Sequence, residues 1–295
     1  MEPQIRAQAG LQPQSTLRRL LSALAVQSYL PNPNDTRYLA LDLSQFNTLS
    51  LATVSQVTNP VVRSLMIRIG GSATVKDTKF PVFWPLAKEL GIPHDIYMYN
   101  WPGWTVDQHI RNFMDSVGQH CDGDLGNIIW VDAECHADKT KRQVSDNTYG
   151  VVEAIGRETG KPVGVYSGLW FINGYMEIQD WMSDTKWWLA QWISDQHMEH
   201  PGPPQTISAI PRENILWHQT GSRCQASIYN GTGYVDTDRW CLSENKYKEI
   251  YDIVEEEEPI PADWWPTYSQ INERVLSIEG RLAEIENRVG RHLQA

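Results

Sequence analysis

The sequence is poor in cysteine. Four Cys residues occur among 295, too few for a disulfide scaffold, and none is paired at a zinc-ligand spacing. Cys224 and Cys241 flank a hairpin-like stretch that contains Gly and Asn. A bridge between these two is an open alternative if the protein works outside a cell, because spacing alone does not determine connectivity.

Long apolar runs and an excess of basic residues are also missing. No apolar run approaches the length that crosses a bilayer, so no membrane span is expected. The net charge is −11, with 36 acidic residues against 25 Lys and Arg. Phosphate binding requires clustered Lys and Arg, so this composition argues against a nucleic-acid partner.

Short apolar runs recur from about residue 38 onward. They are Tyr38–Leu41, Ser64–Ile69, Ile96–Tyr99, Ile128–Val131, Val163–Tyr166, Trp187–Trp192 and Ile215–Trp217. Because these runs are nearly continuous rather than alternating, they indicate strands buried on both faces. Amphipathic segments lie between them, at Phe83–Leu90, Val106–Val117 and Asn147–Thr159.

This alternation predicts an α/β fold with parallel strands and crossover helices. We expect a (β/α)8-type barrel over residues 35–250. The helical pattern weakens after Tyr166, so the barrel should be irregular in its last third.

The N-terminal residues 1–34 are expected to form an arm. Ser15 or Thr16 can cap a short amphipathic helix. Residues 23–25, Ala-Leu-Ala, resemble a signal-peptide cleavage site, but the apolar run is short and follows a long polar lead. A retained arm is therefore favoured over a signal peptide.

An acidic linker that contains Pro occupies residues 251–268, and a heptad pattern follows at 269–295. From residue 251 to the end there are 10 acids and 4 Arg, which gives −6 of the net −11. Apolar residues alternate at spacings of four and three at Ile271, Val275, Ile278, Leu282, Ile285 and Val289. Such a seam is typical of a coiled coil.

Charges flank this seam in a sorted way. With Val275 at position a, the g positions hold Arg274, Arg281 and Arg288, and the e positions hold Glu279 and Glu286. β-Branched Ile at d disfavours a dimer, so a parallel homotrimer is predicted. Two Gly residues in the helix each cost about 1 kcal/mol, which makes so short a coil marginal by itself.

Two carboxyls stand at the end of one apolar run. Residues 128–134 read Ile-Ile-Trp-Val-Asp-Ala-Glu, and side chains two apart leave the same face of a strand. Asp132 and Glu134 should therefore project into one space, where one acid tends to keep its proton while the other ionises. Glycoside hydrolysis requires this arrangement, although a strand that simply enters an acidic loop has the same pattern.

Asp42 and Asp236 follow other apolar runs. The C-terminal ends of the strands of an α/β barrel meet on one face, so the first, fourth and last strands could gather all four acids. An Mg²⁺- or Ca²⁺-dependent hydrolase is a weaker alternative for such a cluster.

With these acids, a series of short motifs resembles the family 25 glycoside hydrolases, the lysozymes of fungi and phages. The motifs are Asp42-Leu43-Ser44, Ile67-Arg68-Ile69-Gly70-Gly71, Tyr97-Met98-Tyr99, the Asp132–Glu134 pair, Gly164–Gly168, Trp188–Trp192, Trp217–Thr220 and Val235–Asp238. Each is weak alone, but their order and spacing over residues 38–240 are fairly specific.

The resemblance implies cleavage of the β-1,4 bond between N-acetylmuramic acid and N-acetylglucosamine in peptidoglycan, without a cofactor or metal. It makes Glu134 the general acid and Asp132 its partner, acting as base or orienting the substrate N-acetyl group. Asp42 and Asp236 would hold charge and water.

Aromatic residues are the candidates for substrate binding, because the chain holds 13 Trp and 12 Tyr. We select Tyr99, Tyr166, Trp192 and Trp217 as sugar-stacking rings, with core packing as the alternative.

Two stretches depart from the family pattern. Residues 99–104, Tyr-Asn-Trp-Pro-Gly-Trp, replace the family's usual His-Phe ending after the third strand. His136 and Asp138, beside the acid pair, also lie outside the motif. These departures bear on substrate detail more than on reaction class.

A muramidase on a trimeric stalk suggests a phage tail component that opens the cell wall locally, in the virion or at the extracellular wall, with other tail proteins as further partners. The alternative is a structural tail protein that keeps the fold and binds glycan without cleaving it. The presence of all four acids favours the enzyme.

The seam should carry most of the association between chains. We predict that Ile278→Asn combined with Ile285→Asn converts the trimer to a monomer, whereas Arg281→Ala only weakens it, because exposed ion pairs contribute little. Light scattering measures the mass. An intact protein that is monomeric at micromolar concentration contradicts the trimer.

Overall fold

Across residues 29–71, 74–193 and 199–253, which the computed structural model describes, nine strands form one sheet. Their order is β1-β9-β8-β7-β6-β5-β4-β2-β3, and β1 also pairs with β2, which closes the sheet into a barrel and leaves β3 outside. The strands are β1 (Leu39–Leu43), β2 (Val62–Gly71), β3 (Val75–Lys76), β4 (His94–Tyr99), β5 (Ile129–Asp132), β6 (Val163–Gly168), β7 (Lys186–Ala190), β8 (Ile215–Gln225) and β9 (Tyr234–Trp240).

The barrel is parallel except at one strand. All pairings from β1 through β2, β4, β5, β6, β7 to β8 are parallel, whereas β9 is antiparallel to both β8 and β1. A short 3-10 helix, η4 (Ala226–Tyr229), joins β8 to β9. This hairpin makes the last part of the barrel irregular. The α/β barrel predicted from the sequence is confirmed.

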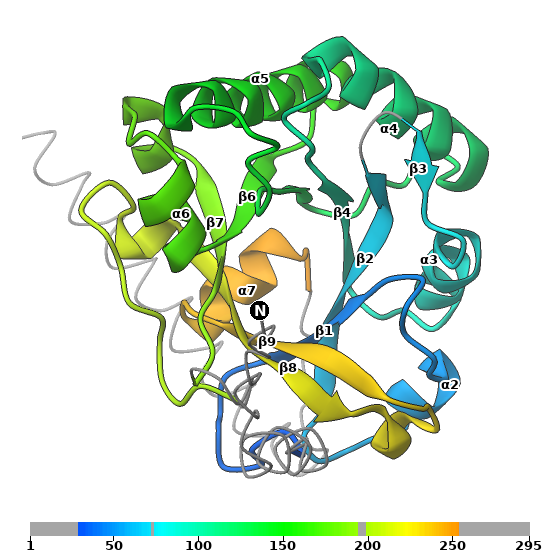
Figure 1. Ribbon diagram of the computed structural model, residues 1–295. Helices are drawn as coiled ribbons and strands as arrows, with labels where there is room; N and C mark the ends of the chain where they lie inside the picture. Colours follow the sequence, from blue (N-terminus) through cyan, green and yellow to red (C-terminus); the bar gives the residue numbers. More distant parts are fainter. Residues whose placement is uncertain (1–28, 72–73, 194–198, 254–295) are drawn as a thin grey trace, which may run out of the picture. The chain divides into compact units, whose positions relative to one another are not determined.

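Helices surround the ring of strands (Figure 1). They are α2 (Leu51–Val54), α3 (Phe80–Glu89), α4 (Val106–His120), α5 (Lys141–Thr159), α6 (Leu169–Tyr175) and α7 (Glu244–Ile250), with the 3-10 helices η1 (Asp180–Ser183) and η3 (Arg212–Asn214). In the described part of the β7–β8 connection, only η3 is helical. The weakening of the helical pattern after Tyr166 corresponds to these short elements.

The longest helix begins earlier than its apolar pattern indicated. α5 starts at Lys141, well before the predicted Asn147. Thr140 caps it by accepting from the backbone of Gln143, whose side chain accepts in return from the backbone of Thr140. This capping box satisfies helix N-terminal N–H groups without any apolar residue, so hydrophobic periodicity did not detect the first turn.

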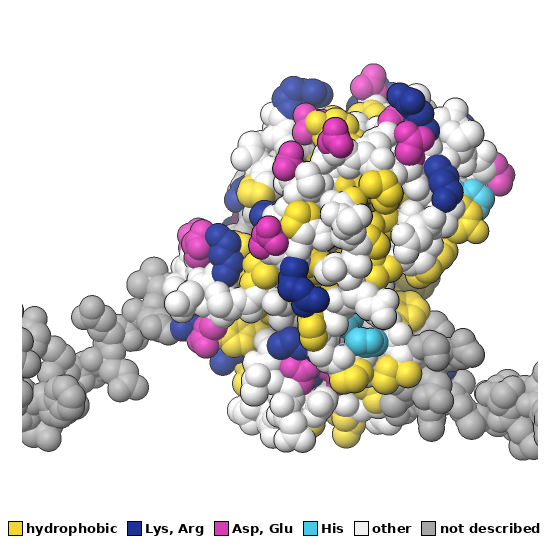
Figure 2. Space-filling view, turned by 90° about the vertical axis from the view of Figure 1, so that its left-hand side faces the viewer, with side chains coloured by type: hydrophobic (Ala, Val, Ile, Leu, Met, Phe, Trp, Pro, Cys, Tyr) yellow, Lys and Arg dark blue, Asp and Glu magenta, His cyan; other side chains and the backbone are white. Residues whose placement is uncertain are grey.

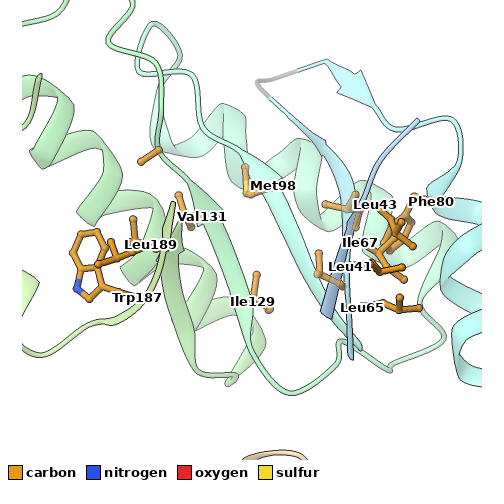
Figure 3. Packing of buried hydrophobic residues seen from close by; sticks show 14 of the residues in the cluster. Leu41, Leu43, Leu65, Ile67, Phe80, Met98, Ile129, Val131, Trp187 and Leu189 are labelled. Atoms are coloured by element: carbon orange, nitrogen blue, oxygen red, sulfur yellow. The ribbon is translucent and has the colours of Figure 1, made fainter. Parts of the chain in front are cut away.

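Alternation along each strand divides the core into two layers. On β1, Leu39, Leu41 and Leu43 belong to the outer cluster under the helices, whereas Ala40 belongs to the cluster inside the barrel. Figure 3 shows the outer cluster, with side chains from successive strands side by side. Both layers are apolar, which explains the nearly continuous apolar runs.

Aromatic side chains close one end of the barrel interior. Tyr247 and Tyr251, on and just after α7, pack against Trp217 and Trp240. Beside them the fully buried Asp95 accepts hydrogen bonds from the Tyr251 hydroxyl (2.7 Å), the indole of Trp130 and backbone N–H groups. Because these side chains fill one end of the barrel interior, the opposite end is available for a site.

The segment before β1 is fastened to the barrel by a buried arginine. Arg239 on β9 forms ion pairs with Glu199 (2.8 Å) and Asp35 (3.7 Å) and donates to the carbonyl of Asn32. Tyr29 donates or accepts a hydrogen bond with Thr237 at 2.6 Å. Residues 29–34, assigned to the arm by sequence, thus contact the barrel.

Several sequence predictions concern other regions. The short N-terminal helix, the coiled coil and nearly all of the linker lie outside the described residues.

The four cysteines are free thiols, so the bridge considered between Cys224 and Cys241 is not formed. Within the described ranges, no helix has the length and apolar character to cross a membrane. Acidic and basic side chains are interspersed on the face that carries α6 (Figure 2).

Candidate active site

Four carboxyls line one cavity of about 400 Å³ at the open end of the barrel. Asp42 on β1 lies directly opposite Asp236 on β9, Asp132 is the last residue of β5, and Glu134 follows two residues later. The strand-end pattern predicted this meeting. One detail differs: β9 is antiparallel, so Asp236 reaches the cavity from near the beginning of its strand rather than its end.

Backbone and side-chain contacts hold Glu134 beyond the end of β5. The preceding residue, Ala133, donates its N–H to the carbonyl of Tyr166 (2.8 Å) and accepts from the hydroxyl of Ser167 (2.6 Å). The chain therefore stays attached to β6 for one residue after β5 ends. This attachment directs Glu134 into the cavity.

The chain turns sharply after Glu134. Ala137 and Asp138 both adopt left-handed backbone conformations, with φ of 45° and 55°. The ring of His136 stacks on Tyr175 at 4.5 Å, and its Nδ1 accepts from the N–H of Asp138. His136 and Asp138, which depart from the family pattern, thus form the turn that leads into α5.

The buried amide of Gln219 connects two of the acids with two aromatic residues. Its Nε2 donates to Asp42 (3.1 Å) and to Asp236 (3.4 Å). Its Oε1 accepts from the Tyr166 hydroxyl (2.9 Å) and the Trp192 indole (3.1 Å). Because the oxygen is occupied by two donors, the amide nitrogen must face the carboxylates, and it supports negative charge on them.

Burial raises the pKa of every carboxyl in this cluster. It raises the pKa of Asp42 to about 7, against the hydrogen bond from Tyr97 and the charge of Arg68. Burial first, and neighbouring carboxylates second, raise the pKa of Asp132 and Asp236 well above their usual range. Four acids in so small a space cannot all ionise, so the cavity holds protons at neutral pH.

Glu134 is the most accessible of the four. Its residue is exposed, yet the surrounding protein removes enough water from the carboxyl to raise its pKa, against the opposing charge of Arg68. Among the described residues no side chain donates a hydrogen bond to it, whereas Asp42 and Asp236 accept from Gln219. Its accessibility makes Glu134 the carboxyl of the four that can pass a proton to a bound substrate.

Arg68 supplies the positive charge at this end of the barrel. It lies on β2, lines the cavity, and forms an ion pair with the buried Asp77 at 2.8 Å. Its charge lowers the pKa of Asp42, Asp132 and Glu134 relative to burial alone. Arg68 therefore limits how strongly the acids retain their protons.

Three of the four aromatic candidates line the acid cavity. They are Tyr99, Tyr166 and Trp192. The prediction for Trp217 is wrong: its ring is fully buried at the closed end of the barrel, where the indole donates to the hydroxyl of Tyr251 (3.1 Å). A ring packed on all sides presents no face to a sugar.

A second cavity of about 450 Å³ adjoins the first. The two share Glu134, Tyr166 and Trp192. The second also includes Trp170 of α6, whose side chain is 64% exposed. The general-acid candidate thus stands between two hollows, which suits a bond inside a longer chain of sugars.

Sequence reasoning assigned no role to three residues that shape this site. Arg68, Tyr97 and Gln219 all occur in motifs that support the family resemblance, but nothing in those motifs distinguishes a residue pointing inward from one pointing outward. Asp238 was likewise unassigned; it is fully buried below Asp236 and accepts from the indole of Trp188 at 2.7 Å.

No group of His, Cys, Asp and Glu within the described ranges has a geometry that could hold a metal ion. The metal-dependent alternative therefore gains no support from the arrangement of the acids.

A closed barrel with carboxyls and aromatic rings at one open end is the architecture of a glycoside hydrolase. The chain belongs to the glycosyl hydrolases family 25, whose sequence pattern matches residues 41–220, more than half of its length. It is a glycosidase.

Solved structures agree with the fold. The spore cortex lytic enzyme SleM of Clostridium perfringens is 22% identical with a TM-score of 0.60, over 72% of this chain and 70% of that one. A family GH25 lysozyme from Aspergillus fumigatus is 16% identical with a TM-score of 0.57, over 73% and 99%. The catalytic domain of endolysin ply40, from bacteriophage P40 of Listeria monocytogenes, is 17% identical with a TM-score of 0.53, over 75% and 100%. Comparison with curated protein sequences gives no match.

The raised pKa of Asp42 predicts how stability depends on pH. Its unfolded value is near 3.8 and its folded value about 7, so the folded protein binds the extra proton in between. This stabilisation is complete below about pH 4 and is lost as pH rises through about 7. Asp42→Asn should therefore raise the melting temperature at pH 8 and reduce its decline between pH 5 and pH 8.

Calorimetry at several pH values measures this effect, and about 1 kcal/mol corresponds to roughly 2–4 °C in a domain of this size. Asp115→Asn, which changes an exposed carboxyl on α4, is the matched control and should leave the pH slope unchanged. An Asp42→Asn slope identical to that of the native protein contradicts the pKa assignment.

Proposed function

We propose that this glycosidase is an N-acetylmuramidase that hydrolyses the β-1,4 bond between N-acetylmuramic acid and N-acetylglucosamine in peptidoglycan. The observation that carries the proposal is the position of Glu134, an accessible carboxyl with a raised pKa that stands above the buried aspartates. A protonated acid next to ionised partners is what glycosidic bond cleavage requires. Membership of family 25 supports the same reaction.

Glu134 donates its proton to the glycosidic oxygen as the bond to the anomeric carbon breaks. Asp42 and Asp236, which accept from Gln219, lie in the same cavity, where a carboxylate stabilises the positive charge that develops on the sugar ring. Water then adds to the anomeric carbon, and Glu134 recovers a proton. Each step uses side chains that line the acid cavity.

Asp132 acts on the substrate N-acetyl group. It is only 6% exposed, and its Oδ1 is buried without a hydrogen-bond partner among the described residues. A buried unpaired oxygen is costly unless a ligand completes it, and the N–H of an acetamido group is a suitable donor. Such depth suits orientation of the substrate better than activation of bulk water.

The extent of the groove favours a polymer over a small sugar as the substrate. The acid cavity continues into the hollow beside Trp170, so sugars on both sides of the cleaved bond find space. Tyr99, Tyr166 and Trp192 provide aromatic surfaces inside the groove, and such rings stack on the apolar faces of sugars.

We further propose that the chain works as a parallel trimer joined through residues 269–295, as a component of a phage tail that opens the cell wall locally. The heptad seam and its sorted Arg and Glu residues support assembly. A bacteriophage endolysin domain among the structures of like fold is compatible with a phage source. The non-catalytic alternative is disfavoured, because all four acids are present and share one cavity.

Replacement of the acid tests the mechanism. Glu134→Gln should lower kcat by about two to four orders of magnitude, the usual contribution of a general acid, while the melting temperature stays near that of the native protein. Release of reducing ends from purified peptidoglycan measures the rate. Native-like cleavage by the folded variant removes Glu134 from the mechanism.

The charge of Arg68 should set the alkaline limit of activity. Because Arg68 lowers the pKa of Glu134, Arg68→Gln should raise that pKa and move the alkaline limb of the kcat/KM profile upward by roughly one pH unit. Arg68→Lys keeps the charge and should leave the limb close to its native position.

The ion pair with Asp77 is lost in Arg68→Gln, so the melting temperature of each variant is measured alongside. A folded Arg68→Gln protein whose alkaline limb does not move shows that Glu134 is not the group that titrates there.

A further inference from the structure

A third hollow, of about 330 Å³, lies on the other side of the acid cavity. It shares Phe46, Arg68 and Tyr99 with that cavity and does not include Glu134 or the aspartates. The hollow is therefore continuous with the site, but no group in it can perform the cleavage. Whatever binds there binds at a distance from the reacting bond.

Exposed aromatic rings form the walls of this hollow. Phe46 is 78% exposed and Trp101 is 39% exposed, and Trp104 lines the same space. The guanidinium of Arg68 lies 5.0 Å from the centre of the Phe46 ring, a cation–π contact that orients the ring. Neighbouring exposed aromatic rings beside a site mark a ligand groove more often than chance.

The loop that carries Trp101 and Trp104 is held in place by two helices. The carbonyl of Trp101 accepts from the N–H of Trp104 (2.9 Å) and from Nε2 of the buried His109 on α4 (3.0 Å). Asn147 on α5 donates to the carbonyl of Trp104 at 3.1 Å. A loop fixed in this way presents its rings without an ordering cost on binding.

Three glycines allow the close packing of the chain around this hollow. A Cβ on Gly103 would lie 2.5 Å from Nε1 of Trp101, so only glycine lets the indole rest against the turn. A Cβ on Gly71 would lie 2.6 Å from the Cβ of Tyr99, and Gly70 adopts a φ of 156° that side chains rarely reach. The wall of the hollow at Gly70 and Gly71 is thus bare backbone.

We propose that this aromatic hollow, defined by Phe46, Tyr99, Trp101 and Trp104, is an additional subsite for an N-acetylated pyranose ring of the glycan strand. The sugar stacks an apolar face on the indole of Trp101, while the acid cavity holds the sugar next to the cleaved bond. The inference rests on the proposed muramidase function and names the part of its substrate that this loop binds.

A sugar fits this hollow better than the peptide attached to the strand. Among the described residues that line it, the one charged side chain is Arg68, which is already paired with Asp77. A carboxylate of a peptide therefore finds no free cation among these residues. Stacking on apolar ring faces needs no charge. The occupant is therefore a further sugar of the same strand, and its contribution depends on the length of the substrate.

Binding is measured by calorimetry in the Glu134→Gln background, where cleavage does not consume the ligand. The probes are a peptide-free hexasaccharide of alternating N-acetylglucosamine and N-acetylmuramic acid and the matching disaccharide. Trp101→Ala should weaken hexasaccharide binding about five- to tenfold and leave disaccharide binding unchanged. Trp101→Phe should restore part of the loss.

Gly103→Ala provides a second variant, because it displaces the indole without removing it, and it should reproduce the loss. Tyr149→Ala is the matched control: Tyr149 is 38% exposed, close to the 39% of Trp101, and it stacks on Trp181 outside the groove. This control should bind the hexasaccharide like its parent.

Each other outcome overturns a distinct claim. Equal hexasaccharide binding by parent and Trp101→Ala removes the subsite, as does an equal loss for both sugars. If a peptide-bearing hexasaccharide is titrated as a third probe and it alone shows the loss with Trp101→Ala, the hollow binds peptide instead. If the folded Glu134→Gln parent binds neither sugar, the muramidase proposal fails and the subsite with it.

Discussion

The crowding of carboxyls at one end of a closed barrel is the constraint on which the site depends. One cavity of about 400 Å³ holds Asp42, Asp132, Glu134 and Asp236. Burial there disfavours the ionised form and raises the pKa of the aspartates. Gln219 holds two of the aspartates by donating to both of them. Glu134 is the accessible carboxyl of the four and therefore the one that can meet the glycosidic oxygen. Aromatic side chains fill the other end of the barrel interior.

Much of the fold could be predicted from the sequence because it follows from local pattern. Continuous apolar runs identified seven of the barrel strands, and the spacing of Asp132 and Glu134 after such a run located the acids. The reversed direction of β9 was missed because hydrophobic pattern carries no strand direction. The signal was present, since the hairpin-like stretch between Cys224 and Cys241 contains the turn pair Asn230-Gly231. The capped first turn of α5 was also missed, since it is polar.

The side-chain contacts of the site were harder to predict than its acids. An aromatic residue in a strand motif fits either the open end or the closed end of a barrel, and Trp217 lies at the closed end because α7 covers it with Tyr247 and Tyr251. The role of Gln219 depends on four partners from distant parts of the chain. Such contacts arise only when β1, β6, β8 and β9 come together. The departure at residues 99–104 did signal a local difference, and the structure locates it at the edge of the groove.

The reaction itself is tested most directly by the sugar found at the newly formed reducing end. Purified peptidoglycan is digested with the full-length protein, the products are reduced with borohydride, and the reduced sugars are identified by mass spectrometry. A muramidase that uses Glu134 to protonate the oxygen leaving N-acetylmuramic acid yields reduced N-acetylmuramic acid in proportion to cleavage. Reduced N-acetylglucosamine in its place, or no new reducing end, contradicts the account.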